Sequence, residues 1–135
     1  MSYTKEHQAL YPKEYFHGID LFNKRQYWEA HEAWEEVWKI SKGEQKLFYQ
    51  GLIQAAAALL HYDRNNTRGA HLCINNALKK LENLPTPYMS LELKSFTKEL
   101  RNFLDDVLET GETMLSKNLG LNHPIIILSV LQDYE

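Results

Sequence analysis

His31 and Glu35 are the residues whose chemical types and spacing first indicate a site in this chain. They stand four positions apart in the run His-Glu-Ala-Trp-Glu, so on a helix their side chains would be neighbours. An imidazole and a carboxylate at this spacing can share a metal ion, or act as an acid/base pair in which the carboxylate orients the ring. The structural alternative is a half-buried salt bridge, and such pairs are common on helices.

The same run differs from the zinc-protease motif His-Glu-x-x-His, because Glu35 occupies the position of the second histidine. If a metal bound there activated water for hydrolysis, Glu32 or Glu29 would be the candidate base. Glu32 points about 100° away from His31 on a helix, which makes it a weaker metal ligand than Glu35. Glu32 and Glu29 are therefore predicted as catalytic residues rather than ligands.

Three further polar side chains, Gln50, Gln54 and His61, align along one sector of the next apolar segment. Buried polar groups need partners, because an unpaired one costs about 1–3 kcal/mol. The natural partners are His31 and Glu35. We therefore predict one partly buried cluster in which His31, Glu35 and His61 would hold a divalent metal such as zinc or manganese and the glutamines would line the pocket. The alternative is a polar network that fixes the register of two helices.

Tryptophans flank the candidate cluster. Trp34 and Trp38 recur one turn apart on the apolar side of the segment that carries His31. Aromatic residues at this spacing usually pack in a core, so both are predicted as core residues that also border the pocket. Trp28 lies off that apolar stripe and is expected to be partly exposed.

The elements that must position these residues are predicted to be helices, since apolar residues recur at intervals of three and four through most of the chain. The two segments that carry the cluster, 27–40 and 44–63, are joined by a short turn, so they should lie antiparallel at the centre. Other helices are expected over 12–23, 67–83 and 90 to about 111, with Ser90 capping the last. Residues 121–135 could form a short strand, an extended arm or a last helical turn.

Length and composition limit the classes of protein. The 135 residues are 44% hydrophobic with a formal net charge of −3, which predicts one folded domain and does not favour nucleic acid as a partner. The longest uncharged run, 47–62, is shorter than the roughly 20 residues that cross a bilayer. Cys73 is the only cysteine, and the first residues lack the apolar segment of a signal peptide. We therefore expect a cytoplasmic protein without a membrane span.

Three stretches together resemble the domain-of-unknown-function 309 family: residues 16–23 (FHGIDLFN), 27–38 (YWEAHEAWEEVW) and 50–57 (QGLIQAAA). Gly69-Ala70 at the start of the following helix fits as well. The resemblance extends over about 16–84, and it is weak in the C-terminal part, 90–135. It implies a small all-helical fold, and the label of predicted metal-dependent hydrolase that members have carried implies a site at His31, Glu32 and Glu35.

The sequence therefore predicts a single all-α domain over residues 1–135, a compact bundle of about five helices. Three functions compete for it. The first is a metal-dependent hydrolase, the second is a non-enzymatic helical module that binds a protein partner, and the third is a pocket for a small organic molecule. Substrate, partner and homo-oligomeric state are left open by the sequence.

Overall fold

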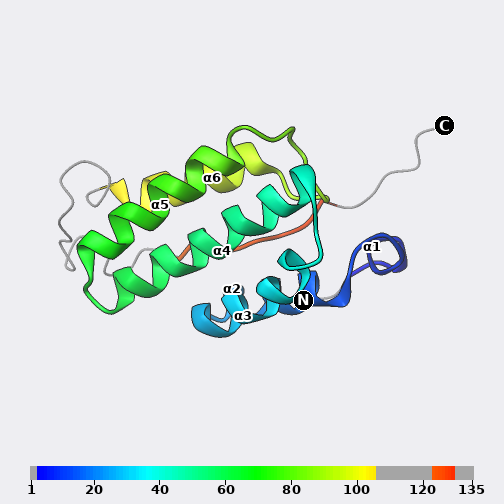
Figure 1. Cartoon of the computed structure of the whole chain (residues 1–135), viewed down its shortest axis with the longest axis horizontal. Helices are drawn as coiled ribbons and strands as arrows, with labels where there is room; N and C mark the ends of the chain where they lie inside the picture. The colour runs from blue at the N-terminus through cyan, green and yellow to red at the C-terminus, as the bar shows by residue number, and fades with distance from the viewer. Residues whose placement is uncertain (1–2, 106–122, 130–135) are drawn as a thin grey trace.

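The structure, a computed structural model, describes residues 3–105 and 123–129. This part of the chain contains no strand, and Tyr88 and Leu91 form a single antiparallel bridge. The predicted all-α bundle is confirmed (Figure 1). Its helices are α1 (Lys5–Leu10), α2 (Lys13–Asn23), α3 (Tyr27–Trp38), α4 (Gly43–Asp63), α5 (Thr67–Leu81) and α6 (Leu93–Phe103). None of these helices is long and apolar enough to span a bilayer.

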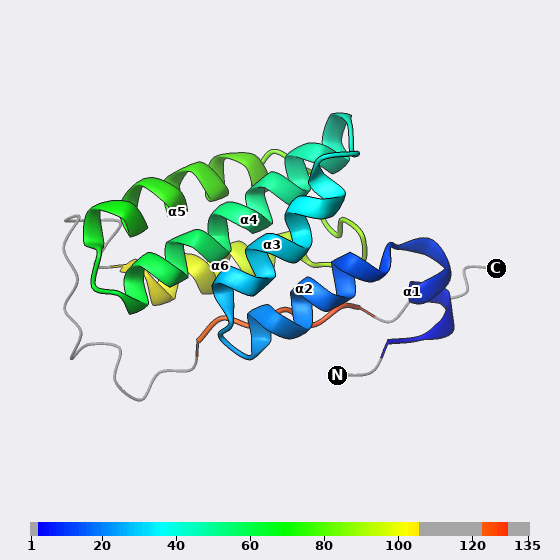
Figure 2. The same ribbon diagram turned by 60° about the horizontal axis from the view of Figure 1, so that its bottom comes forward.

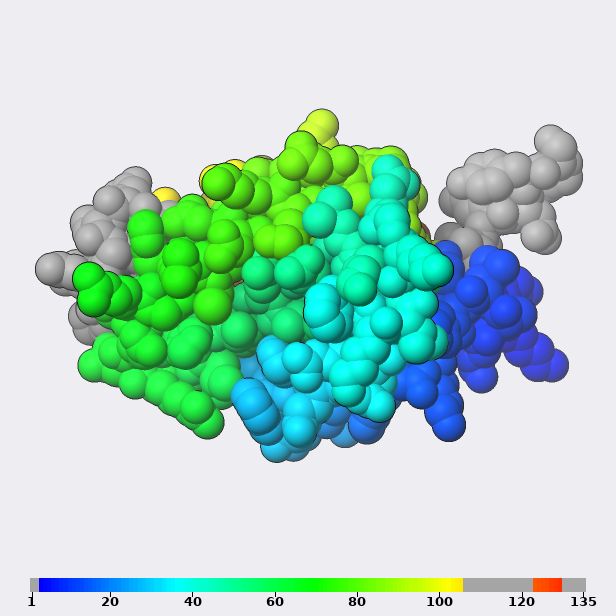
Figure 3. All heavy atoms as spheres, viewed as in Figure 1, coloured from blue at the N-terminus to red at the C-terminus, as the bar shows by residue number. Residues whose placement is uncertain are grey.

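The longest helix, α4, lies between α3 and α5 (Figures 1 and 2). This position explains why it is apolar on several sides: Phe48, Leu52, Ala55 and Leu59 are all fully buried. In the space-filling view, the atoms of α3, α4 and α5 form one continuous face (Figure 3). From α2 to α6, each helix packs against the next one along the chain. The bundle closes where the ring of Phe22 in α2 meets that of Phe96 in α6.

The contact between α2 and α3 is unusually close at Gly18. A Cβ atom at this position would lie 2.1 Å from Nε1 of Trp34, so only glycine leaves room for the indole. Trp34 is fully buried, and its Nε1–H donates a hydrogen bond of 3.2 Å to the carbonyl oxygen of Tyr15. The prediction that Trp34 is a core residue is confirmed. Trp38 is only partly buried, although it packs against the core.

Two local features differ from the sequence prediction. Helix α1 was not expected; Thr4 caps it by accepting a hydrogen bond from the backbone N–H of His7. The prediction that Ser90 caps α6 is wrong, because the helix begins at Leu93 and Thr86 Oγ1 accepts the Leu93 N–H at 2.9 Å. The cap thus comes from across a loop. The expected continuation of this helix toward residue 111 falls outside the described residues.

Residues 123–129 form an extended arm without regular secondary structure, one of the three alternatives for the tail. The arm runs along α2 and α6, and Figure 2 shows it in orange and red beneath these helices. Ile126 is fully buried and Leu128 nearly so. The arm therefore completes the apolar core between the two helices, whereas 121–122 and 130–135 lie outside the described residues.

His123 at the start of the arm lies in a mostly apolar setting. Its ring contacts that of Phe103, with 4.7 Å between the centroids, and its Nε2 is 3.6 Å from Oδ1 of Asp63. Burial lowers the pKa of His123, and the positive charge of Arg25 lowers it further, while the nearby Asp63 carboxylate opposes the shift. The net effect favours the neutral imidazole in the folded protein.

We expect His123 to make stability depend on pH. Because its pKa is lower when folded, the unfolded chain takes up a proton first, and the stability from this group is complete above about pH 6.5. That contribution should be lost as the pH falls through the lowered pKa. The free energies of unfolding of wild type and His123→Gln, measured with urea between about pH 8 and pH 5, should therefore approach each other toward the acidic end. A constant difference between the two free energies of unfolding across this range would show that His123 does not cause the pH dependence.

Candidate functional site

His31 and Glu35 are neighbours on α3, as their spacing predicts. Nε2 of His31 is 3.9 Å from Oε2 of Glu35, and the two side chains are 22% and 42% exposed. At 3.9 Å the two groups are too far apart for a direct hydrogen bond. Trp28 stacks on the His31 ring, with centroids 5.2 Å apart and planes 9° from parallel. Indole and carboxylate therefore hold the imidazole from two directions.

Among the residues that the structure describes, several buried polar atoms on α3 and α4 have no hydrogen-bond partner, including His31 Nδ1 and Trp38 Nε1 on α3 and Gln54 Oε1 on α4. The register of the two helices is set where Lys46 Nζ lies 4.7 Å from the centre of the Trp38 ring. His31 lies about two turns before Trp38 on α3, and Gln54 lies about two turns after Lys46 on α4. Because the two helices are antiparallel, Gln54 is level with His31. Gln50 is partly buried one turn earlier on the same side of α4. We call these four residues of α3 and α4, His31, Trp38, Gln50 and Gln54, the polar seam.

His61 contacts the turn that follows α4. Its Nδ1 is 3.1 Å from Nδ2 of Asn66, and its ring lies against Gly69, where a Cβ would come within 2.8 Å. By the register just described, Tyr27 at the start of α3 is about level with Ala57 of α4, so His61 lies about a turn beyond it. The imidazole therefore supports the turn between α4 and α5.

The metal site implied by the family resemblance needs at least three protein ligands if it is catalytic. Within residues 3–105 and 123–129, no three His, Cys, Asp or Glu side chains are grouped so that they could hold a metal ion. His31 and Glu35 supply two donors, and His61 does not join them as a third. The described residues do not fit the implied site, and no hydrolytic step follows from them.

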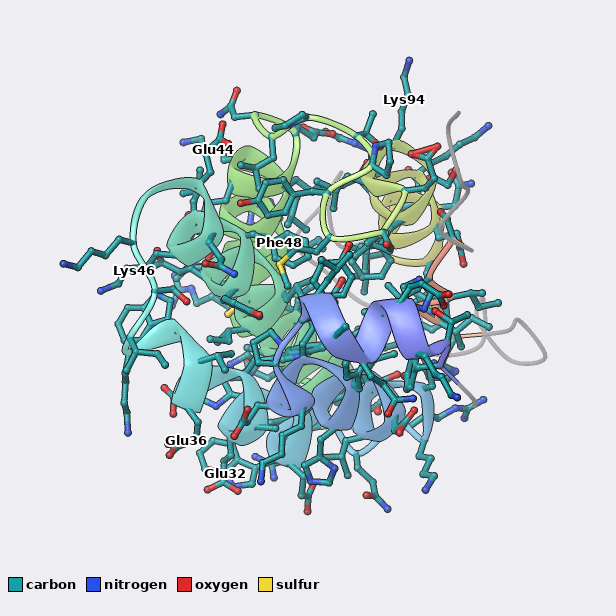
Figure 4. All side chains as sticks on the ribbon, turned by 90° about the vertical axis from the view of Figure 1, so that its right-hand side faces the viewer. Glu32, Glu36, Glu44, Lys46, Phe48 and Lys94 are labelled. Carbon is teal, nitrogen blue, oxygen red and sulfur yellow. The ribbon has the colours of Figure 1, made fainter. Side chains whose placement is uncertain are left out.

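Glu29 and Glu32, the predicted bases, line a surface away from the His31–Glu35 pair. They border a groove of about 470 Å³ between α2 and α3, which Leu21, Ala33, Glu36 and His17 also line. Figure 4 shows Glu32 and Glu36 together at one edge of the molecule, far from Glu44. The structure thus divides the predicted site between two sides of α3.

His17 also lines this groove, although it stands at no metal-ligand spacing from another residue in the sequence. It lies on the exposed side of α2, one residue before the glycine at which α2 approaches α3 most closely. Gly18 is the signal in the sequence that could have placed His17 beside α3, because a side chain next to a close helix crossing must lie near the partner helix. Acidic residues of α3 line the groove beside it, and one of them, Glu36, accepts a hydrogen bond through Oε2 from Lys39 Nζ at 3.2 Å.

Comparisons with known proteins agree with this architecture. Residues 15–72 match the family described as "Domain of unknown function (DUF309)". A conserved hypothetical protein from Thermus thermophilus, known from its crystal structure, is 32% identical to this chain in sequence. The two structures match with a TM-score of 0.61, and the match covers 70% of this chain and 97% of that one. The chain belongs to the DUF309 family. The DUF309 match contains the polar seam and the α2–α3 groove and ends within α5.

Two curated relatives are longer than this DUF309 chain. An uncharacterized protein of Aquifex aeolicus (strain VF5) is 35% identical over 92 residues, which are 67% of this chain and 26% of the relative. The uncharacterized protein YpuF of Bacillus subtilis (strain 168) is 37% identical over 75 residues, 54% of this chain and 43% of the relative. The chain therefore spans less than half the length of either.

Proposed function

We propose that this DUF309 protein is a non-enzymatic binding module whose docking surface for a protein partner is the α2–α3 groove. The observation that carries the proposal is the composition of that groove. Partly buried Leu21 and Ala33 supply its apolar part, and exposed Glu29, Glu32 and Glu36 surround it. A surface that combines apolar contact with one sign of charge selects a partner that is both apolar and of opposite charge.

The carboxylates of the groove favour a basic partner. Glu29, Glu32 and Glu36 follow one another at helical spacing along α3, so they present a row of negative charge about one turn apart. Within the described part of the chain, Glu29 and Glu32 form no ion pair, so both are available to a partner. Lysine or arginine side chains at the same spacing on a docked helix would face them.

Trp28 adds an aromatic anchor next to this row. It is 49% exposed, although it stacks on His31, and it stands one turn before Glu32 on α3. Exposed tryptophans that become buried on association often contribute much of the binding energy. We infer an amphipathic helix as the partner, with basic residues facing the glutamates and small apolar residues in the groove.

The lengths of the relatives support a module. In the longer Aquifex and Bacillus proteins, the region similar to this chain is one part of a larger protein. The Thermus chain, by contrast, is covered almost completely. A domain that occurs both alone and joined to other sequence suits a role in bringing proteins together.

The test measures binding of a short amphipathic helical peptide made of Lys, Leu and Ala, followed by fluorescence anisotropy. We expect Glu29→Gln/Glu32→Gln to weaken binding about tenfold, because two carboxylates facing basic side chains are lost. Added salt should weaken wild-type binding more than binding by this variant, since screening acts on the charges that the variant no longer has.

The matched control is Glu6→Gln/Glu44→Gln, which changes the net charge equally at exposed positions on α1 and α4. This control should bind the peptide like wild type. Equal weakening in both double variants would mean that the peptide senses only net charge. Preferential binding of a peptide with Glu in place of Lys would also refute the proposal.

A further inference from the structure

The arm at 123–129 is held in a channel between α2 and α6 as an extended peptide would be. Its side chains alternate: Ile126 and Leu128 point inward and are 0% and 7% exposed. Ile125 and Ile127 point outward and are 42% and 64% exposed. This period of two is that of an extended strand whose one side is buried.

The channel contacts the backbone of the arm through two side chains, Asn23 and His7, and one backbone carbonyl, that of Ser90. Asn23 at the end of α2 makes both bonds to Ile126: its Nδ2 donates to the carbonyl oxygen at 2.8 Å, and its Oδ1 accepts the N–H at 2.7 Å. At the other end of the arm, Ser129 donates its N–H to the carbonyl oxygen of Ser90 at 2.7 Å. Nε2 of His7 is 2.8 Å from the Ser129 carbonyl oxygen.

These contacts have the character of peptide recognition. An amide that pairs with both backbone groups of one residue reads an extended main chain without regard to its side chain. Specificity then comes from the two apolar positions that the channel buries. The contacts come from α1, α2 and the loop before α6, so the binding surface is assembled by the helices rather than by the arm itself.

We propose that the α2–α6 channel is a peptide-binding site that its own arm fills, and that it accepts an extended segment of a partner protein with apolar residues at alternate positions. The segment 126–128, Ile-Ile-Leu, represents the ligand. The arm is then an intramolecular competitor, and the affinity for a partner is reduced by the fraction of time that the arm occupies the channel. This site is independent of the α2–α3 groove.

The experiment uses a fluorescent synthetic peptide with the sequence of residues 123–129 and the full-length chain. Ile126→Asp places a charge at a fully buried position and should release the arm, so the peptide should bind this variant at least about tenfold more tightly than wild type. Ile125→Asp puts the same charge on the outward side of the arm and should leave the affinity at the wild-type level. A peptide with Asp at the position of Ile126 should not bind.

A second substitution tests the channel itself. Asn23→Ala in the Ile126→Asp background removes both backbone contacts and should weaken peptide binding about tenfold or more. Asn75→Ala on α5 removes an amide of the same kind outside the channel, and should have no effect. Equal peptide binding by wild type and Ile126→Asp would overturn the proposal.

Folding and self-association are checked in the same samples. If Ile126→Asp and the milder Leu128→Ser both lose cooperative unfolding, the arm is an indispensable part of the core and the channel is no ligand site. If Ile126→Asp forms dimers by light scattering and excludes the peptide, the channel takes a second copy of the chain and the partner assignment is wrong. Folded, monomeric variants with the expected affinities support the proposal.

Discussion

Trp34→Ala should lower the free energy of unfolding by about 3–5 kcal/mol, as large aromatic deletions in a core do. The indole is fully buried, its ring centroid is 5.9 Å from that of Phe22, and its N–H is bonded to the Tyr15 carbonyl. Removing it leaves a cavity between α2 and α3 and takes away the hydrogen bond to the Tyr15 carbonyl oxygen. Urea unfolding followed by circular dichroism gives the value directly.

Trp28→Ala is the matched control, since it removes the same side chain from the same helix. Trp28 is about half exposed and contributes chiefly its stacking on His31, so the expected cost is below about 1 kcal/mol. Trp38→Ala should fall between the two, because Trp38 is partly buried beneath Lys46. Similar costs for Trp34 and Trp28 would show that the assignment of the core side of α3 is wrong.

The helices could be predicted because their periodicity is local. The apolar spacing within 12–23 and 44–63 determines which residues must be buried, and these ranges agree with α2 and α4 to within a residue. The antiparallel pairing of α3 and α4 follows from the short turn between them. Within the first of these ranges, Gly18 lies directly against Trp34.

The missed features depend on contacts between segments that are distant in sequence. Thr86 caps α6 from across a loop, whereas the local sequence pattern predicts Ser90. The arm lies between α2 and α6, where Asn23 binds its backbone. The residues within 121–135 alone do not indicate this position. In each case the partner is specified by tertiary packing rather than by spacing along the chain.

The candidate site was only partly predictable for a related reason. Spacing within α3 correctly makes His31 and Glu35 neighbours, but it does not say which neighbouring helix each side of α3 faces. Glu32 was therefore grouped with His31, although it lies in the groove shared with α2. His61 shares a sector with Gln54 on α4, yet the first residue of α3, Tyr27, lies about one turn short of its level.

Gly18→Ala should destabilise the protein by about 2 kcal/mol, even though alanine is the better helix former. Replacing glycine within a helix gains about 1 kcal/mol of intrinsic propensity. At Gly18 the added methyl would lie 2.1 Å from Trp34 Nε1 and 2.5 Å from Cδ1, and a buried indole has no room to move aside. Overpacking of a rigid core typically costs about 1–3 kcal/mol, occasionally more, so the steric term exceeds the propensity gain.

Gly51→Ala provides the comparison within α4. The methyl there would lie 2.6 Å from Cδ2 and 2.7 Å from Cγ of Leu81, which is also fully buried, so Gly51→Ala should destabilise the protein by a comparable amount. The decisive measurement is a double-mutant cycle. In a Trp34→Phe background the smaller ring leaves space for the methyl, and Gly18→Ala should lose most of its cost, with a coupling energy of about 1–2 kcal/mol. Additive effects would mean that the α2–α3 crossing yields elsewhere and that glycine is not what sets the distance between these helices.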